Sequence, residues 1–139
     1  MPILCVDVLI VRNRQVLLVN RKIEPLAGQW WTPGGRMLRG ESIRESVKRI
    51  AKAETGLRVE PLGFVTHLEF QSKADPFGHG HGTHTVSLVY AAEYVGGKYK
   101  PDKTNGNSEW WDGDWTSAPA PTPAVMVRIV DRYFRGRDV

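Results

Sequence analysis

The chain has 139 residues, a length that suits one domain with a substantial core and is too short for two. Its net charge of +4 weakly favours anionic ligands, and without a compact lysine and arginine block we expect a phosphate-rich small molecule rather than nucleic acid. No long apolar run or signal-type segment is present, so we expect neither a membrane span nor export, and the single Cys5 fits a small core residue in a reducing, cytoplasmic compartment.

Two strands are predicted near the N-terminus. The apolar run at residues 3–11 predicts a central strand buried on both faces, in which Asp7 must find a partner or face a cleft. A turn leads to a second strand at residues 16–19, and a loop follows it. Three tryptophans are expected to pack in the core: Trp30, Trp31 and Trp115.

A helix from Ser42 to about Thr55 has the strongest local signals. Ser42 and Glu45 have the spacing of a capping box, and Gly56 suits a left-handed stop just past the helix end. At about 100° per residue, Glu54 lies in the middle of an apolar stripe on this helix. The stripe consists of Ile43, Val47, Ile50 and Ala51.

A carboxylate in an apolar stripe is costly unless a cation meets it. Glu54 could extend its head to water from the end of the helix, or it could hold a metal ion beneath the preceding glycines. Pro33, Gly34 and Gly35 predict a tight turn into the helix, where glycine allows positive φ and a close approach of the backbone to a ligand. With this turn present, we favour Glu54 as a metal ligand.

The second half of the chain predicts further strands, polar loops and one more helix. We expect strands at residues 57–59, 63–70, 83–94 and 109–116, and polar loops at residues 71–82 and 100–108. A stretch rich in proline and alanine leads to a helix at residues 124–133. Strands with two separated helices indicate an α/β fold in which a mixed sheet lies between the helices.

Six residues around the predicted helix have a recognisable spacing, G-x5-E-x7-R-x4-E-x-G-[apolar]. They are Gly35, Glu41, Arg49, Glu54, Gly56 and Leu57. This frame resembles the Nudix box, in which two further glutamates are usual where this chain has Ile50 and Ala53. The same two glutamates are missing in the GDP-mannose mannosyl hydrolase branch of that family, which the chain resembles over residues 2–94. The resemblance implies a single Nudix-type α/β/α sandwich over residues 1–139, and it suggests a homodimer.

The resemblance also implies a metal site and a reaction. Mg²⁺, or alternatively Mn²⁺, would be held by the carbonyl of Gly34 and by Glu54. The implied reaction is hydrolysis of a nucleotide-sugar, GDP-mannose to GDP and mannose, by attack of water on the anomeric carbon. Arg21 and Arg36 would bind the diphosphate and stabilise the leaving group, since guanidinium groups suit phosphate oxygens. Arg49 would also bind substrate, or anchor a box carboxylate such as Glu41.

The base that activates water is where the chain departs from the branch. The histidine and glutamine of the branch fall on residues 107–109 here, which leaves Glu109 as the candidate base or an extra metal ligand; it could also be a simple strand-edge carboxylate. His84 matches a histidine of the branch, which implies a substrate contact. His79 and His81 lie in the predicted glycine-rich loop and could belong to a zinc site or a lid, although such loops are more often simply flexible.

Two other functions stay open at this point. One is a Nudix pyrophosphohydrolase that attacks phosphorus in another nucleoside diphosphate derivative. The other is a non-catalytic nucleotide-sensing domain, because the box has lost two carboxylates.

Overall fold

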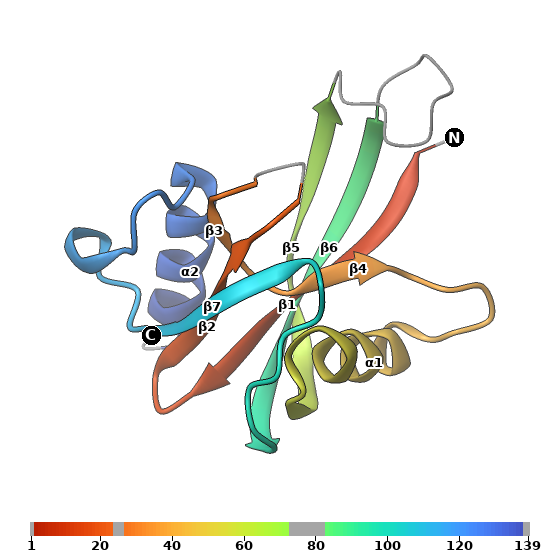
Figure 1. The fold of residues 1–139 in the computed structure, drawn as a ribbon, viewed down its shortest axis with the longest axis horizontal. Coiled ribbons are helices and arrows are strands. Elements are labelled where there is room, and N and C mark those ends of the chain that lie inside the picture. Colours follow the sequence, from red (N-terminus) through yellow and green to blue (C-terminus); the bar gives the residue numbers. More distant parts are fainter. Residues whose placement is uncertain (1, 24–26, 73–82, 138–139) are drawn as a thin grey trace.

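The computed structural model describes residues 2–23, 27–72 and 83–137, and the predicted loop histidines His79 and His81 lie outside the described residues. Within these described residues, seven strands, two α-helices and one short 3₁₀ helix follow one another (Figure 1). In chain order they are β1 (Ile3–Arg12), β2 (Gln15–Arg21), β3 (Trp30–Trp31), β4 (Gly34–Arg36), α1 (Ile43–Thr55), β5 (Arg58–Ser72), β6 (Thr83–Gly96), β7 (Asn105–Trp111), the 3₁₀ helix Trp115–Ser117 and α2 (Ala124–Arg137).

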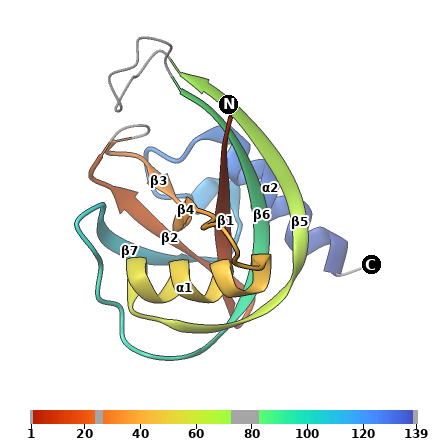
Figure 2. The ribbon, with the colours of Figure 1, turned by 90° about the vertical axis from the view of Figure 1, so that its right-hand side faces the viewer.

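The strands form one mixed sheet, and β1 is at its centre. The main strand order is β3-β2-β1-β6-β5, while β4 also pairs with β1 and β7 also pairs with β2. The pairing of β1 with β6 is parallel, and the other pairings are antiparallel. Helices α1 and α2 lie on opposite sides of this sheet (Figure 2). The predicted sandwich, with a mixed sheet between helices, is confirmed.

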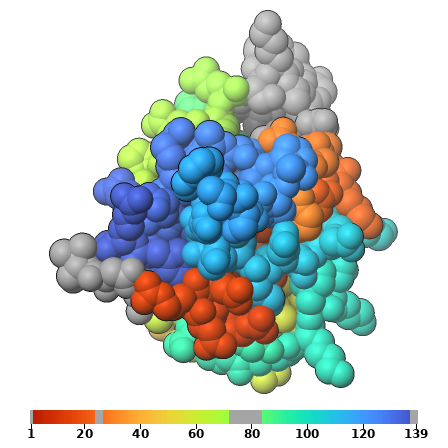
Figure 3. Space-filling model, turned by 90° about the vertical axis from the view of Figure 1, so that its left-hand side faces the viewer, coloured from red at the N-terminus to blue at the C-terminus, as the bar shows by residue number. Residues whose placement is uncertain are grey.

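Successive side chains of β1 point to opposite faces of the sheet, so they belong to two separate hydrophobic clusters. Val6, Val8 and Ile10 pack against α1, whereas Leu9 packs on the side of α2. Because successive strand residues point to opposite faces, Asp7 lies on the same face as Leu9. The α2 side is covered by that helix and by the segment that follows β7, as the blue atoms in Figure 3 show. None of the described helices is long and apolar enough to cross a membrane.

The start and the end of α1 agree with the sequence prediction. The Ser42 hydroxyl accepts a hydrogen bond from the Glu45 backbone N–H at 3.1 Å, and the Glu45 carboxylate accepts one from the Ser42 N–H at 3.3 Å. Gly56 ends the helix in the left-handed conformation, with φ of 76°, and its N–H donates to the Lys52 carbonyl. Local sequence therefore fixes the length of the helix that bears Glu54.

Five of the predicted elements differ from those in the structure. The glycine turn is instead the short strand β4, which pairs with β1. A single irregular strand, β5, replaces the two strands predicted at residues 57–59 and 63–70, because β6 pairs along its whole length. Strand β7 begins at Asn105 rather than at residue 109, and α2 continues to Arg137.

The tryptophan prediction is correct for Trp31 and wrong for Trp115. Trp31 is buried at 3% exposure, whereas Trp115 is 76% exposed in the 3₁₀ helix after β7. The Asp114 carboxylate caps that helix by accepting a hydrogen bond from the Thr116 N–H. This local contact stabilises the segment while the Trp115 side chain stays exposed.

Candidate functional site

A cavity of about 540 Å³ lies beside β4, on the face of β1 that bears Asp7. Its lining combines aromatic and aliphatic walls with a carboxylate, hydroxyl groups and two arginines. The lining residues are Cys5, Asp7, Arg21, Ile23, Trp31, Gly34, Gly35, Arg36, Phe70, Gln71, Thr85, Ser87 and Thr104. A mostly apolar hollow with a few convergent polar groups is the usual form of a small-molecule site.

Asp7 has found protein partners and also faces this cavity, so both predicted alternatives hold. The Trp31 indole N–H donates to Asp7 Oδ1 at 3.3 Å, and the Ser87 hydroxyl donates to Oδ2 at 2.5 Å. Burial raises the pKa of Asp7 to about 6, against the effect of these two hydrogen bonds.

The same carboxylate explains why position 34 is glycine. A Cβ atom on Gly34 would overlap Asp7 Oδ1 and would lie 3.1 Å from Asp7 Cγ. Positive φ is not the reason, because Gly34 does not belong to the described glycines with positive φ. Glycine at this position therefore allows β4 to approach a side chain of β1, and the predicted approach of its backbone to a ligand stays a prediction.

The Glu54 side chain extends from α1 to the side of β4 opposite Asp7. Its Oε1 atom accepts hydrogen bonds from the Gly34 N–H at 3.3 Å and from Asn105 Nδ2 at 3.0 Å. Burial raises the pKa of Glu54, and these two hydrogen bonds lower it. The carboxylate therefore does not simply extend to water, because it is held between β4 and the start of β7.

The end of α1 brings the segment before β7 to Glu54. Carbonyl groups in the last turn of a helix lack partners within the helix. Here the Lys100 N–H donates to the Thr55 carbonyl at 2.7 Å, and the Asp102 N–H donates to the Glu54 carbonyl at 3.3 Å. The helix end thus anchors the segment from which Asn105 reaches the Glu54 side chain.

Asn105 is the site residue that the sequence prediction missed, together with its neighbour Asp102. Its Nδ2 donates to Glu54 and, at 3.3 Å, to Asp102 Oδ1. Its Oδ1 is buried and has no hydrogen-bond partner in the part of the chain that the structure describes. Such an oxygen is rare in native proteins. Nothing in the local sequence separates Asn105 from the other polar residues that precede β7.

Glu41 and Arg49 form the pair that the sequence suggested. Arg49 Nε donates to Glu41 Oε2 at 2.7 Å, and Arg49 Nη2 donates to the Arg36 carbonyl at 2.8 Å. Glu41 Oε1 also accepts from the Ser46 hydroxyl at 2.6 Å and from the Leu38 N–H at 2.9 Å. The Arg49 guanidinium therefore ties the segment after β4 to α1, and its predicted contact with substrate stays a prediction.

This pair predicts an acid-dependent part of the stability. The hydrogen bond from Arg49, followed by those from Ser46 and Leu38, lowers the pKa of Glu41 from 4.5 to about 2. A lowered pKa means that the stabilisation is present above about pH 4.5 and is lost as the pH falls towards 2. Glu41→Gln should therefore lower the melting temperature most near neutral pH, and the difference from wild type should shrink in acid.

A matched control is Glu60→Gln, which breaks an exposed ion pair with Arg44 and should change the melting temperature little at any pH. Thermal unfolding followed by circular dichroism over this pH range measures both variants. A constant difference between Glu41→Gln and wild type at every pH would contradict the interpretation.

The structure brings together some of the predicted site residues and separates others. Arg21 and Arg36 line the cavity together with Gly34, and Glu54 accepts a hydrogen bond from Gly34 on the α1 side of β4. His84 is exposed, and its neighbour Thr85 lines the cavity, so the alternation of β6 directs His84 to the other face.

Glu109 is not brought to Glu54. It is exposed on β7 and pairs with Leu18, whose side chain packs in the cluster on the α2 side. It also lies four residues beyond Asn105, about 13 Å at the rise of a strand. Its role as a base stays a prediction without support from this arrangement.

The residues around Glu54 fit a hard divalent cation. The described parts of the chain contain no cluster of three or more His, Cys, Asp or Glu side chains that could hold a metal ion. Mg²⁺ needs no such cluster, because it commonly uses one or two protein carboxylates together with water and substrate phosphates. The partly buried Glu54 carboxylate and the Oδ1 of its partner Asn105, which accepts no hydrogen bond from the described residues, are oxygen atoms of the kind that such an ion binds.

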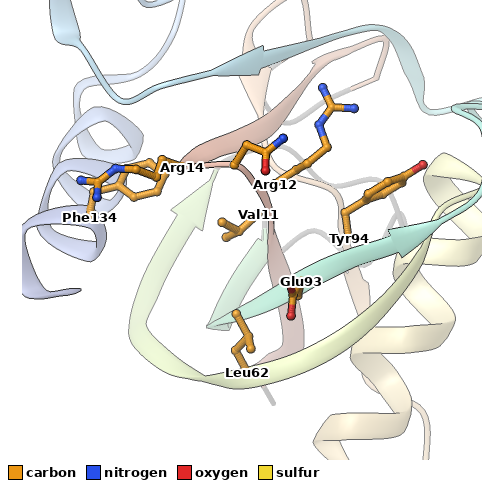
Figure 4. Close-up of a pocket in the computed structure, with 8 residues that line it drawn as sticks. Val11, Arg12, Arg14, Leu62, Glu93, Tyr94 and Phe134 are labelled. Carbon is orange, nitrogen blue, oxygen red and sulfur yellow. The ribbon is translucent and has the colours of Figure 1, made fainter. Parts of the chain in front are cut away.

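A second hollow, of about 480 Å³, lies near the β1–β2 turn and contains none of the predicted site residues (Figure 4). Arg12 projects there, with its guanidinium carbon 4.1 Å from the centre of the Trp110 ring and 5.8 Å from that of Tyr94. This arrangement is typical of a cation–π contact that packs an arginine at the surface.

Comparisons with known proteins agree on one family. Residues 1–131 match the family described as "NUDIX domain". The chain is 31% identical over 111 residues to an "ADP-ribose pyrophosphatase" of Methanocaldococcus jannaschii, an alignment that covers 80% of this chain and 62% of that protein. It is 35% identical over 89 residues to an "Oxidized purine nucleoside triphosphate hydrolase" of Mus musculus, covering 58% of this chain and 57% of that protein. The chain thus spans less than two thirds of these curated relatives.

A solved structure agrees with the fold. The MutT protein from Methanosarcina mazei Go1 superposes with a TM-score of 0.80 at 23% identity, covering 99% of this chain and 97% of that chain. At this identity the similarity concerns the fold alone.

Proposed function

The chain belongs to the Nudix family, and from this premise we propose that it is a metal-dependent hydrolase of a nucleoside diphosphate derivative. One observation carries the proposal. Asn105 donates through Nδ2 to the Glu54 carboxylate, and its buried Oδ1 has no hydrogen-bond partner among the described residues; Glu54 itself contacts Gly34 of β4, which lines an arginine-bearing cavity. Oxygen donors next to β4, together with arginines that line the cavity beside this strand, suit a diphosphate that contacts both.

Nudix hydrolases generally use divalent metal ions such as Mg²⁺. Here Glu54, Asn105 Oδ1 and the Gly34 carbonyl would hold the ion. When bound, it would neutralise diphosphate charge and so make the phosphate a better leaving group.

The protein groups have separable tasks in this proposal. Arg21 and Arg36, which line the cavity, bind the diphosphate oxygens and hold the scissile bond in place. The hydrogen bond that the Gly34 N–H donates to the Glu54 carboxylate fixes β4 against α1, and Arg49 fixes the next residues through Glu41 and the Arg36 carbonyl. The phosphate-binding strand is therefore held in position before substrate arrives.

For the substrate we propose a nucleotide-sugar, GDP-mannose or a close analogue, with water attacking the anomeric carbon. The support is that two box positions carry no carboxylate. Ile50 is buried against Gly35, and the side chain of Ala53 is exposed. With fewer carboxylates to activate water at phosphorus, departure of an intact diphosphate from carbon is the simpler reaction. A cytoplasmic homodimer is the accompanying prediction.

A second candidate is hydrolysis at phosphorus. The name of the relative from Methanocaldococcus jannaschii, an ADP-ribose pyrophosphatase, favours it. In that case a nucleoside monophosphate and a sugar phosphate would be released instead of a nucleoside diphosphate and a free sugar.

Hydrolysis of GDP-mannose in ¹⁸O-labelled water separates the two candidates. We expect GDP and mannose, with the label in mannose only, detected by mass spectrometry of the products. GMP and mannose phosphate, with the label in phosphate, would assign attack to phosphorus. Nucleotide-sugar binding without metal-dependent turnover of any tested nucleotide would indicate a sensing domain and would refute the hydrolase proposal.

The same assay tests Glu109, which we retain as the proposed base on sequence grounds. A general base typically contributes about 10²- to 10⁴-fold to the rate, so Glu109→Gln would lower turnover by that factor and leave metal affinity unchanged. Turnover equal to that of Glu93→Gln, an exposed control on β6, would place the base elsewhere.

A further inference from the structure

The Asp7 carboxylate has no role in the proposed hydrolysis, although the chain keeps it on an otherwise apolar strand. It is only 8% exposed, and its neighbours along β1 belong to the two hydrophobic clusters. Burying a carboxylate in such surroundings is unfavourable unless several donors compensate for the lost water. The raised pKa of Asp7 has this desolvation as its largest cause.

The protein satisfies this carboxylate only in part. Trp31 donates to Oδ1 and Ser87 donates to Oδ2, both as neutral groups, and the charge of Arg21 also favours the ionised carboxylate. A carboxylate has about four acceptor positions, two on each oxygen. These two hydrogen bonds from the described residues occupy one position on each oxygen, and Asp7 lines the cavity in which a ligand would lie.

The walls of the cavity next to Asp7 suit a flat aromatic group. The Trp31 and Phe70 rings pack edge to face, with centroids 5.8 Å apart, and both line the cavity. Thr85 and Ser87 continue the lining along β6 on the same face as Asp7. An aromatic pocket with one carboxylate in its floor orients a planar ligand by the donors on the ligand's edge.

We propose that Asp7 selects the base of the nucleotide, and that this base is a purine with two adjacent N–H donors, as in guanine. This inference rests on the proposed nucleotide hydrolase function and names the residue that determines base specificity at that site. Guanine offers N1–H beside its 2-amino group, two parallel donors that match the two oxygens of a carboxylate. Adenine and cytosine offer an amino group beside an acceptor nitrogen, which would face a carboxylate oxygen and repel it. Uracil has a single N–H between two carbonyl groups.

Binding of nucleoside diphosphates tests the proposal without any need for turnover. Isothermal titration calorimetry with Mg²⁺ should show that the wild-type chain binds GDP at least about tenfold more tightly than IDP, which lacks the 2-amino group, and than ADP. A hydrogen bond to a charged group is worth about that factor or more. This comparison needs no variant, so it holds even if substitutions at Asp7 impair folding.

Two variants test whether Asp7 is the residue that causes the preference for GDP. Asp7→Asn should weaken GDP binding about tenfold and bring the GDP and IDP affinities to within about threefold of each other, because one of the two acceptor oxygens is replaced by an NH₂ group, which can only donate. Asp112→Asn makes the same chemical change at an exposed position after β7 and should keep the wild-type preference. Melting temperatures of both variants verify that they are folded.

Equal wild-type affinities for GDP, IDP and ADP would overturn the proposal, as would a GDP preference that survives in Asp7→Asn. Nucleotide turnover without base preference would refute only this inference. A GDP preference in a protein that hydrolyses nothing would refute only the hydrolase proposal. Absence of binding to all three nucleotides would refute both.

Discussion

Glu54→Gln should reduce metal-dependent turnover by at least about a hundredfold, the order expected when a group that stabilises transition-state charge is lost. Glutamine keeps the size of the side chain and can still accept the hydrogen bonds from Gly34 and Asn105. It removes only the negative charge. The concentration of Mg²⁺ that gives half-maximal activity should therefore rise together with the loss of kcat, while the fold stays intact.

Glu45→Gln is the matched control, because it lies on the same helix, at its exposed capping end. Steady-state rates over a Mg²⁺ titration, with melting temperatures of both variants, separate a site effect from a folding effect. Unchanged turnover in Glu54→Gln would exclude Glu54 as a metal ligand.

Gly34→Ala should destabilise the fold by about 1–3 kcal/mol or more, the usual range for an extra methyl group forced into a packed interior. The new Cβ would overlap Asp7 Oδ1 and lie 3.2 Å from the Val6 carbonyl oxygen. Asp7 cannot easily turn away, because Trp31 and Ser87 hold both of its oxygens. Urea unfolding followed by tryptophan fluorescence measures the loss.

The next glycine provides the control for this substitution. A Cβ on Gly35 would lie 3.4 Å from Glu54 Oε2 and 3.5 Å from Ile50 Cγ1, which are ordinary contact distances. Gly35→Ala should therefore change the free energy of unfolding by less than about 0.5 kcal/mol. The cost of Gly34→Ala should also fall when it is measured in an Asp7→Ala background, as a double-mutant cycle would show. Equal costs at the two glycines would contradict the overlap with Asp7.

Local sequence was sufficient for the parts of the site that lie on α1. The capping box, the left-handed Gly56 and the position of Glu54 in the apolar stripe follow from spacing within a single helix. The sandwich could be predicted as well, because the apolar runs and their separation by helices are properties of the chain order.

The residues that sequence did not find owe their places to contacts between distant segments. Asn105 reaches Glu54 across 51 positions, through a loop anchored on the helix end, and no local pattern encodes that docking. The local sequence around Gly34 predicts a turn, because the partner that makes it part of a sheet, Asp7, lies on a different strand. The aromatic side chain of Trp115 predicts a core position, whereas the Asp114 cap shapes its segment into an exposed 3₁₀ helix.

The central position of β1 in the sheet makes the part of the site around Asp7 more rigid than the part around Asn105. β1 is hydrogen-bonded to β6 along one edge and to β2 and β4 along the other, so its amide groups are protected on both sides. Amides of this kind exchange with solvent only when the whole domain opens. Asp7 belongs to this most protected strand, whereas Asn105 begins β7, which pairs with β2 and continues from a loop. The residues around Asn105 can therefore change position through local fluctuations of the chain. The cavity wall that Asp7 forms moves only when the whole domain opens.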